Sequence, residues 1–182
     1  MTVNLEGSKT EKNLLKALQG EALAGVKYEF YSSKAKKDGY VQLSEIFKEA
    51  SDNEKEHAKV WFKLLHGGEV NDTLSNLDEA IETEEYEWSD MYMNFAHDAK
   101  KEGFSDIAHL FELTAAIERS HERIYKSFVK NIKNDCVFEK PDEIVWKCGN
   151  CGNLHYSKTA PETCPMCDHP QSYYRKLDES YK

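Results

Sequence analysis

The chain has 182 residues, 40% of them hydrophobic, and its 33 acidic and 24 basic residues give a formal net charge of −9. This length allows one domain of ordinary size and a small second one, and the acidic balance argues against a nucleic-acid-binding surface. The first residues, MTVNLEGSKTEKN, contain no apolar run. We therefore expect neither a secretory signal nor a membrane anchor, and we expect a cytoplasmic location.

The first predicted helix begins at a capping box formed by Ser8 and Glu11 and ends near Gly39. Its apolar stripe contains an acid, Glu21, near the middle and a tyrosine, Tyr28, two turns further on. Residues in such a stripe share one face of the helix. We expect both side chains on the buried face.

The second predicted helix has apolar residues in steps of three and four from Leu43 to Leu64. Glu54 and His57 lie within this stripe, three residues apart, and so share one helix face. A single ExxH pair in an acidic helical protein is more often part of a solvated face. An ionised carboxylate inside an apolar stripe is costly to desolvate, however, and this favours a ligand role.

After a polar segment we expect a third helix that starts near Leu77, and then a fourth helix with the most regular apolar spacing of the chain. The stripe of the third helix contains Glu84 and Glu87, and that of the fourth contains Glu118 and His121. Every predicted stripe therefore has a carboxylate near its middle.

The predicted helices belong to an internal repeat with a period of 64 residues. KKDGYVQLSEIF, from Lys36, recurs as KKEGFSDIAHLF, from Lys100, and the same offset relates Tyr28 to Tyr92. A duplicated helical hairpin with two ExxH pairs is typical of a four-helix bundle that holds two metal ions in its core, with a further Glu from each of the other two helices. Carboxylate and imidazole ligands together favour iron or manganese.

One ligand position stays open at this point. The 64-residue offset places Glu21 opposite Glu85, whereas the apolar stripe and the three-residue spacing to Glu87 favour Glu84. The repeat alone does not decide between the two acids.

The last part of the chain contains two CxxC pairs separated by twelve residues, formed by Cys148, Cys151, Cys164 and Cys167. This spacing is typical of a tetrahedral four-thiolate site, and so small a domain needs the metal to fold. Structural Zn and a single redox-active Fe both suit four thiolates. Pro141 and the loss of helical period indicate a linker, so we predict domains at 1–135 and 146–182 with the linker at 136–145.

Segments from both predicted domains resemble the rubrerythrin family. In chain order they are GEALAGVKYEFY, EASDNEKEHAKVWFKLL, EEYEWSDMYMNFA, AAIERSHERIY and WKCGNCGNLHYSKTAPETCPMCDHPQSYY. The resemblance covers nearly the whole chain and requires both domains in this order. It implies a mainly α fold, in which a ferritin-like four-helix bundle precedes a small rubredoxin-like domain with short β-strands.

The resemblance also implies roles for individual residues. Six residues match the ligands of a diiron centre: Glu21, Glu54, Glu84, Glu87, Glu118 and His121. His57 matches the histidine that exchanges with the residue at Glu87 as one iron moves between oxidation states, and Tyr28 and Tyr92 match tyrosines beside the ligands. The four cysteines would hold one further Fe, or Zn in its place.

The function implied by the resemblance is that of an NADH-linked peroxidase, which protects a low-oxygen cell against oxidative stress. Diferrous iron would reduce hydrogen peroxide to water, and a reductase or rubredoxin would return electrons through the four-cysteine iron. The family implies a homo-oligomer, at least a dimer, with no nucleic-acid or membrane partner. Thr83, Glu85 and Tyr86 depart from common family residues without removing a ligand, although the charge of Glu85 would affect the redox potential.

Two other functions stay open on the sequence. The first is a ferritin-like ferroxidase that retains ferric iron, and the four-cysteine domain speaks against it because storage needs no electron inlet. The second is a non-enzymatic metal-binding module with a zinc ribbon, which a colourless protein loaded with Zn would favour.

Overall fold

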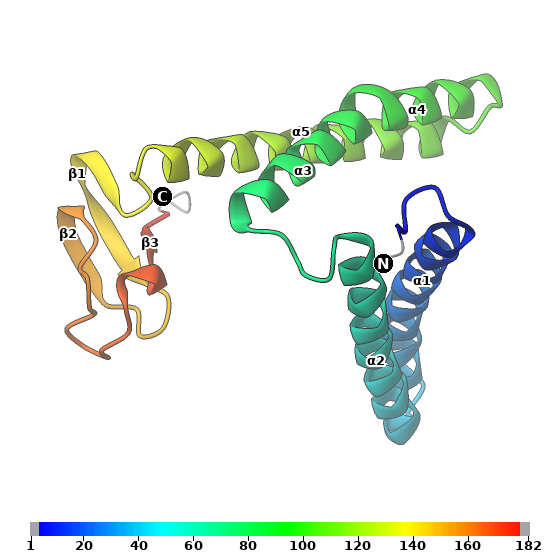
Figure 1. Cartoon of the computed structure of the whole chain (residues 1–182), viewed down its shortest axis with the longest axis horizontal. Helices are drawn as coiled ribbons and strands as arrows, with labels where there is room; N and C mark the ends of the chain where they lie inside the picture. Colours follow the sequence, from blue (N-terminus) through cyan, green and yellow to red (C-terminus); the bar gives the residue numbers. More distant parts are fainter. Residues whose placement is uncertain (1–3, 179–182) are drawn as a thin grey trace. The chain divides into compact units, whose positions relative to one another are not determined.

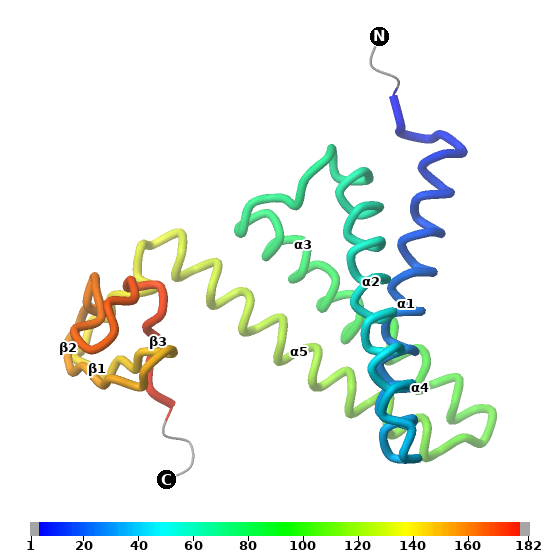
Figure 2. The backbone as a smooth tube through the Cα atoms, turned by 90° about the horizontal axis from the view of Figure 1, so that it is seen from below, coloured from blue at the N-terminus to red at the C-terminus, as the bar shows by residue number. Residues whose placement is uncertain are grey.

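The computed structural model describes residues 4–178. The chain forms two compact units, Met1–Asp72 and Thr73–Lys182. The first unit is a helical hairpin of α1 (Lys9–Lys37) and α2 (Val41–Leu65), which lie side by side in both views (Figures 1 and 2). The second unit contains a helical hairpin and a small three-stranded sheet.

The start of α1 confirms the expected cap. The backbone N–H of Glu11 donates to the hydroxyl of Ser8 at 3.0 Å, and the Glu11 carboxylate accepts from the N–H of Gly7 at 2.7 Å. One backbone donor of the first helical turn, that of Glu11, and the N–H of the residue before the cap are thereby satisfied. The helix ends before Gly39, whose φ of +89° needs a residue without a Cβ.

The third predicted helix is a single helix with an irregular middle. It consists of α3 (Thr73–Tyr86), the π-helical turn η1 (Glu87–Met91) and α4 (Tyr92–Lys101), and it packs along α5 (Ser105–Lys133). The expected start near Leu77 is wrong by four residues: the helix begins at Thr73, and Leu74, which extends the apolar spacing by one turn, stands among polar residues. The sequence did not indicate the π-helical turn.

The internal repeat is confirmed by the packing of the two hairpins. The rings of Tyr28 and Phe47 lie 6.1 Å apart at an interplanar angle of 36°. Their counterparts, Tyr92 and Phe111, lie 6.1 Å apart at 34°. The two hairpins therefore place equivalent aromatic rings in equivalent positions.

Some residues of the apolar stripes predicted for the second, third and fourth helices are exposed within their own unit, since a pair of helices can cover only one side of each helix. Leu43 of α2 is 43% exposed, Phe95 of α4 is 44% exposed and Ile107 of α5 is 46% exposed. The expectation that these stripes form the core of a four-helix bundle stays a prediction.

The small domain is an antiparallel sheet with the strand order β2-β1-β3, formed by β1 (Glu139–Cys148), β2 (Leu154–Thr159) and β3 (Tyr174–Lys176). The single-turn helix η2 (Gln171–Tyr173) precedes β3. The core of the domain contains Trp146, Cys148, Ala160, Cys164 and Tyr174.

The predicted linker at 136–145 contains the start of β1. Glu139 pairs with Thr159, and the register then shifts before Ile144 pairs with Ser157. The segment is therefore more regular than the sequence indicated, and the proposed domain boundaries stay a prediction.

The predicted fold class is confirmed: the chain is mainly α, with four helices followed by a region of short antiparallel strands. Across residues 4–178, no helix has both the length and the apolar content that crossing a membrane requires.

Candidate metal centres

The first hairpin brings together Glu21 of α1 with Glu54 and His57 of α2. One ligand atom of each residue lies within 4.8 Å of the others. His57 Nδ1 lies 2.9 Å from a carboxylate oxygen of Glu54, whose side chain is 19% exposed. The hydrogen bond with His57, and then one with Glu21, lowers the pKa of Glu54, although partial burial acts against this shift. The anionic form of the Glu54 carboxylate is therefore favoured.

The second hairpin brings together Glu84 of α3 with Glu118 and His121 of α5, again with ligand atoms within 4.8 Å of one another. His121 Nδ1 lies 2.7 Å from Glu118 and 3.6 Å from Glu84. Burial raises the pKa of Glu84, the charges of Glu118 and Glu87 raise it further, and His121 acts in the opposite direction. A bound cation would relieve this crowding of negative charge.

Glu87 and Tyr92 lie close to this second cluster. Burial raises the pKa of the Tyr92 phenol, and the negative charges of Glu87, Glu118 and Glu84 add to that shift. The Tyr92 hydroxyl therefore stays protonated at neutral pH and can donate a hydrogen bond. In the first hairpin, the ring of Tyr28 contacts those of Tyr31 and Phe47.

Glu84 and Glu85 lie in different surroundings. Glu84 belongs to the cluster, whereas Glu85 is 55% exposed and lies 3.6 Å from Lys126. The 64-residue offset had indicated Glu85. Before the π-helical turn the correct offset is 63 residues, which relates Glu21 to Glu84, and after it the offset is 64.

The π-helical turn explains this change of offset. The N–H of Tyr92 bonds to the carbonyl of Glu87, five residues back, in place of the usual four. Tyr28 lies seven positions after Glu21, whereas Tyr92 lies eight positions after Glu84. The wide turn accommodates the extra residue, so that Glu84 and Tyr92 still serve the same cluster.

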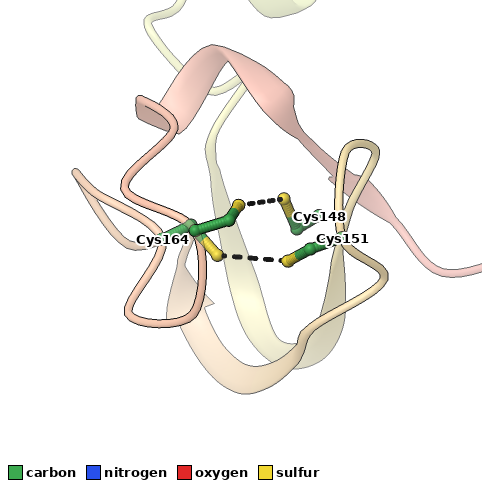
Figure 3. A group of neighbouring side chains, drawn as sticks. Cys148, Cys151 and Cys164 are labelled. Carbon is green, nitrogen blue, oxygen red and sulfur yellow. Dashed lines mark hydrogen bonds between the residues drawn. The ribbon is translucent and has the colours of Figure 1, made fainter.

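The small domain brings together the four predicted cysteines, whose sulfur atoms lie within 4.8 Å of one another. The sulfur atoms of Cys148 and Cys167 lie 3.9 Å apart, and those of Cys151 and Cys164 lie 3.6 Å apart. Figure 3 shows Cys148 and Cys151 on one side of the cluster and Cys164 on the other. Cys148 and Cys164 are fully buried. The fifth cysteine, Cys136, is not part of this cluster.

Both cysteine loops use the same backbone turn. The N–H of Gly152 donates to the carbonyl of Cys148 at 2.9 Å, and the N–H of Asp168 donates to that of Cys164 at 2.9 Å. Gly152 and Asp168 occupy equivalent positions and both have positive φ, at +78° and +55°. These are residue types that tolerate this conformation.

The pKa values of Cys164 and Cys151 shift in opposite directions. A hydrogen bond from Tyr174 lowers the pKa of the Cys164 thiol to about 6. A backbone N–H of Asn153 acts to lower the pKa of Cys151, but desolvation and the neighbouring thiols raise it to about 12. Of these two thiols, that of Cys164 is therefore the more readily deprotonated.

These donor sets fit iron. Carboxylate oxygen with imidazole nitrogen suits iron or manganese, and four thiolates suit a single Fe or Zn. A chain that combines a diiron carboxylate site with a four-cysteine rubredoxin-like site is a non-haem iron protein. That class includes several families, and comparison with known proteins separates them.

The family model for rubrerythrin matches residues 12–129 and 75–147, and the model for the rubredoxin-like domain of rubrerythrin matches residues 146–175. Rubrerythrin-1 of Clostridium acetobutylicum is 46% identical and covers 98% of this chain and 99% of its own length. Rubrerythrin of Nitratidesulfovibrio vulgaris is 41% identical, with coverage of 96% and 97%. The chain belongs to the rubrerythrin family.

Among solved structures, nigerythrin in a partially reduced state is 25% identical and has a TM-score of 0.36, with coverage of 97% of this chain and 90% of that one. The predicted family and the two kinds of iron site are confirmed by the family matches. The individual ligands stay predictions.

Sequence reasoning missed one group of residues. Trp88, Arg119, Glu122 and Lys126 form a polar cluster beside the π-helical turn. Glu122 is only 5% exposed. The signal that could have identified it is the four-residue spacing from Glu118, which directs both side chains toward the third helix.

Proposed function

We propose that this chain is a peroxidase that reduces hydrogen peroxide to water at a diiron centre and receives its electrons through the four-cysteine iron site. The single observation that carries the proposal is the presence, in one rubrerythrin-family chain, of two carboxylate and histidine clusters together with a four-thiolate cluster. Rubrerythrin-family members are oxidoreductases, and an iron-storage protein would need no electron inlet.

In this proposal seven residues serve the two iron ions: Glu21, Glu54, His57, Glu84, Glu87, Glu118 and His121. Each hairpin contributes one ExxH pair and at least one further acid, as expected for a dinuclear site in a helical bundle. When bound there, two ferrous ions would supply the two electrons that, with two protons, convert one hydrogen peroxide into two water molecules.

The side chains of the site have distinct tasks. The carboxylates would offset the positive charge of the ions, and His57 and Glu87 would serve as alternative ligands of one ion. His57 is 57% exposed, which leaves its ring room to move. The protonated Tyr92 hydroxyl can donate a hydrogen bond to a ligand carboxylate and hold its orientation. Tyr28 has the corresponding task in the first hairpin.

The four-cysteine site is the electron inlet in this proposal. Cys148, Cys151, Cys164 and Cys167 would hold a single Fe, which would supply one-electron transfer. The electrons come from NADH through an external reductase or a rubredoxin. We further propose a homo-oligomer, at least a dimer, in the cytoplasm.

Stopped-flow mixing of the fully reduced protein with hydrogen peroxide and, separately, with O₂ tests this function. We expect oxidation by hydrogen peroxide to be much faster, and the oxidised protein to return to the reduced state with an NADH-linked donor. Faster oxidation by O₂ with accumulation of ferric mineral would instead indicate a ferroxidase. Metal analysis of the native protein must find Fe at the four-cysteine site, because a chain loaded with Zn alone would contradict the proposed inlet.

A further inference from the structure

The π-helical turn of the second hairpin begins at Glu87, the acid that has no counterpart in the first hairpin. With the 63-residue offset that relates Glu21 to Glu84, the position equivalent to Glu87 is Ala24. Isolated π-helical turns occur mostly at functional sites, and they are less regular than the surrounding helix. Other contacts must therefore determine where this turn places Glu87.

Those contacts come from α5 and converge on Trp88, the residue after Glu87. The indole Nε1–H of Trp88 donates to a carboxylate oxygen of Glu122 at 3.1 Å. The guanidinium carbon of Arg119 lies 5.1 Å from the centre of the Trp88 ring, within the range of a cation–π contact. One edge and one face of the indole are thus held by the helix that carries Glu118 and His121.

The Glu122 side chain is held in position by burial and by hydrogen bonds. It is 5% exposed, and its second carboxylate oxygen accepts a hydrogen bond from Lys126. Each of its two carboxylate oxygens thus has its own donor, the Trp88 indole N–H for one and the Lys126 ammonium group for the other. A buried carboxylate with two charge-assisted or polar partners has little freedom to move.

We infer that Glu122 is a positioning residue for Glu87, and that it acts through the Trp88 indole to set where the π-helical turn presents the Glu87 carboxylate to the metal cluster. Glu122 touches neither the metal nor the substrate in this arrangement. The inference rests on the proposed function, since it assumes that Glu87 is a ligand. Partners that orient metal ligands affect metal affinity or activity by about 10- to 100-fold when they are removed.

The test uses the full chain with Zn in the four-cysteine site and Co²⁺ as the probe of the carboxylate clusters. Trp88→Phe keeps an aromatic ring but loses the donor, and Glu122→Ala loses the acceptor. We expect both variants to bind Co²⁺ about 10- to 100-fold more weakly. Glu122→Gln keeps an amide oxygen that can accept from the indole, and we expect it to bind close to wild type. Glu85→Ala, on the exposed side of the same helix, is the matched control.

Hydrogen exchange of the Tyr92 amide in the metal-free protein gives a second readout, because that N–H makes the five-residue hydrogen bond of the turn. We expect faster exchange in Trp88→Phe and Glu122→Ala, and wild-type exchange in Glu122→Gln. Wild-type Co²⁺ affinity in Trp88→Phe, or a loss in Glu122→Gln as large as in Glu122→Ala, would overturn the inference.

A Glu87→Ala variant separates this inference from the proposed function. If Glu87→Ala binds Co²⁺ as wild type does, the proposed ligand role of Glu87 fails, and the inference fails with it. If Glu87→Ala weakens binding while Trp88→Phe does not, only the positioning role of Glu122 is overturned.

Discussion

Ser51 donates a hydrogen bond from its hydroxyl group to the backbone carbonyl oxygen of Gly25, at 2.8 Å, across the interface between α1 and α2. Ser51 is fully buried. A Cβ atom at Gly25 would lie 3.4 Å from the carbonyl oxygen of Ser51 and 3.6 Å from the Cβ of Glu54. The small residues at this crossing therefore set the distance at which Glu21 and Glu54 meet.

The first prediction concerns this crossing. Gly25→Leu should push α1 away from α2, lower the free energy of unfolding by about 1–3 kcal/mol and reduce iron binding. Gly20→Ala is the matched control, since nothing lies within 4 Å of a Cβ added there. It should raise the free energy of unfolding by about 0.5–1 kcal/mol, because alanine is the better helix former. Urea denaturation of the metal-free proteins and iron counts per chain measure both effects, and equal behaviour of the two variants would contradict the prediction.

The second prediction separates two neighbouring acids. Glu84→Ala should lose iron from the diiron centre, because Glu84 lies with Glu118 and His121, whereas Glu85→Ala should retain it. Both changes remove one negative charge from adjacent positions of α3, so a general charge effect would appear in both. Iron per chain and peroxide-driven oxidation of the reduced protein provide the comparison. Loss of iron in Glu85→Ala alone would restore the 64-residue offset as the correct guide to the ligand.

The third prediction tests the proposed electron inlet. Cys148→Ser should remove the thiolate-to-iron absorption of the small domain and prevent repeated turnover with an NADH-linked donor. The same variant should still oxidise once with hydrogen peroxide after chemical reduction, because its carboxylate clusters are intact. Cys136→Ser, which changes a thiol outside the sulfur cluster, should behave as wild type. Steady turnover of Cys148→Ser at the wild-type rate would show that electrons reach the diiron centre by another route.

The fourth prediction concerns stability at low pH. In the folded state, hydrogen bonds from Lys126 and Trp88 and the nearby charge of Arg119 hold the pKa of Glu122 below its usual value of 4.5. A lowered pKa means that this carboxylate stabilises the fold above pH 4.5 and loses that contribution as pH falls through the folded-state pKa.

Glu122→Gln should therefore show a shallower decrease in the free energy of unfolding between about pH 5 and pH 3 than wild type. Urea denaturation of the metal-free protein at a series of pH values measures the two slopes. Other acids with lowered pKa values, such as Asp52 and Glu112, are the same in both proteins and cancel in the comparison. Identical slopes would show that Glu122 does not contribute to acid sensitivity.

Local patterns made most of the architecture predictable. Helical periodicity indicated four helices, and two CxxC pairs indicated the sulfur cluster, because both features depend on residues close in sequence. The start of β1 was missed since Pro141 and the charges around it conceal a strand whose partners lie in β2 and β3. The contact between Trp88 and Glu122 was missed because the four-residue spacing from Glu118 indicates only the helix face on which Glu122 lies, and not its partner on another helix.

The choice between Glu84 and Glu85 shows a different limit. The sequence offered two criteria for the ligand position, the 64-residue repeat and the apolar stripe, and the positions they indicated differed by one residue. A single offset assumes that both halves of the repeat have equal length. The stripe pointed to Glu84 because it follows local helix geometry, which holds on each side of the wide turn even where the count of residues changes.

In an ordinary α-helix, one inserted residue rotates everything beyond it by about 100° and would turn the buried face of α4 away from α5. The wide turn from Glu87 to Met91 absorbs that rotation, and the ring pair formed by Tyr92 and Phe111 keeps the 6.1 Å spacing of its counterpart in the first hairpin. The duplicated hairpins have thus diverged in length without diverging in packing. A change in chain length could be tolerated here because the rotation that it causes is absorbed within five residues, and the site is asymmetric at Glu87, where the first hairpin has Ala24.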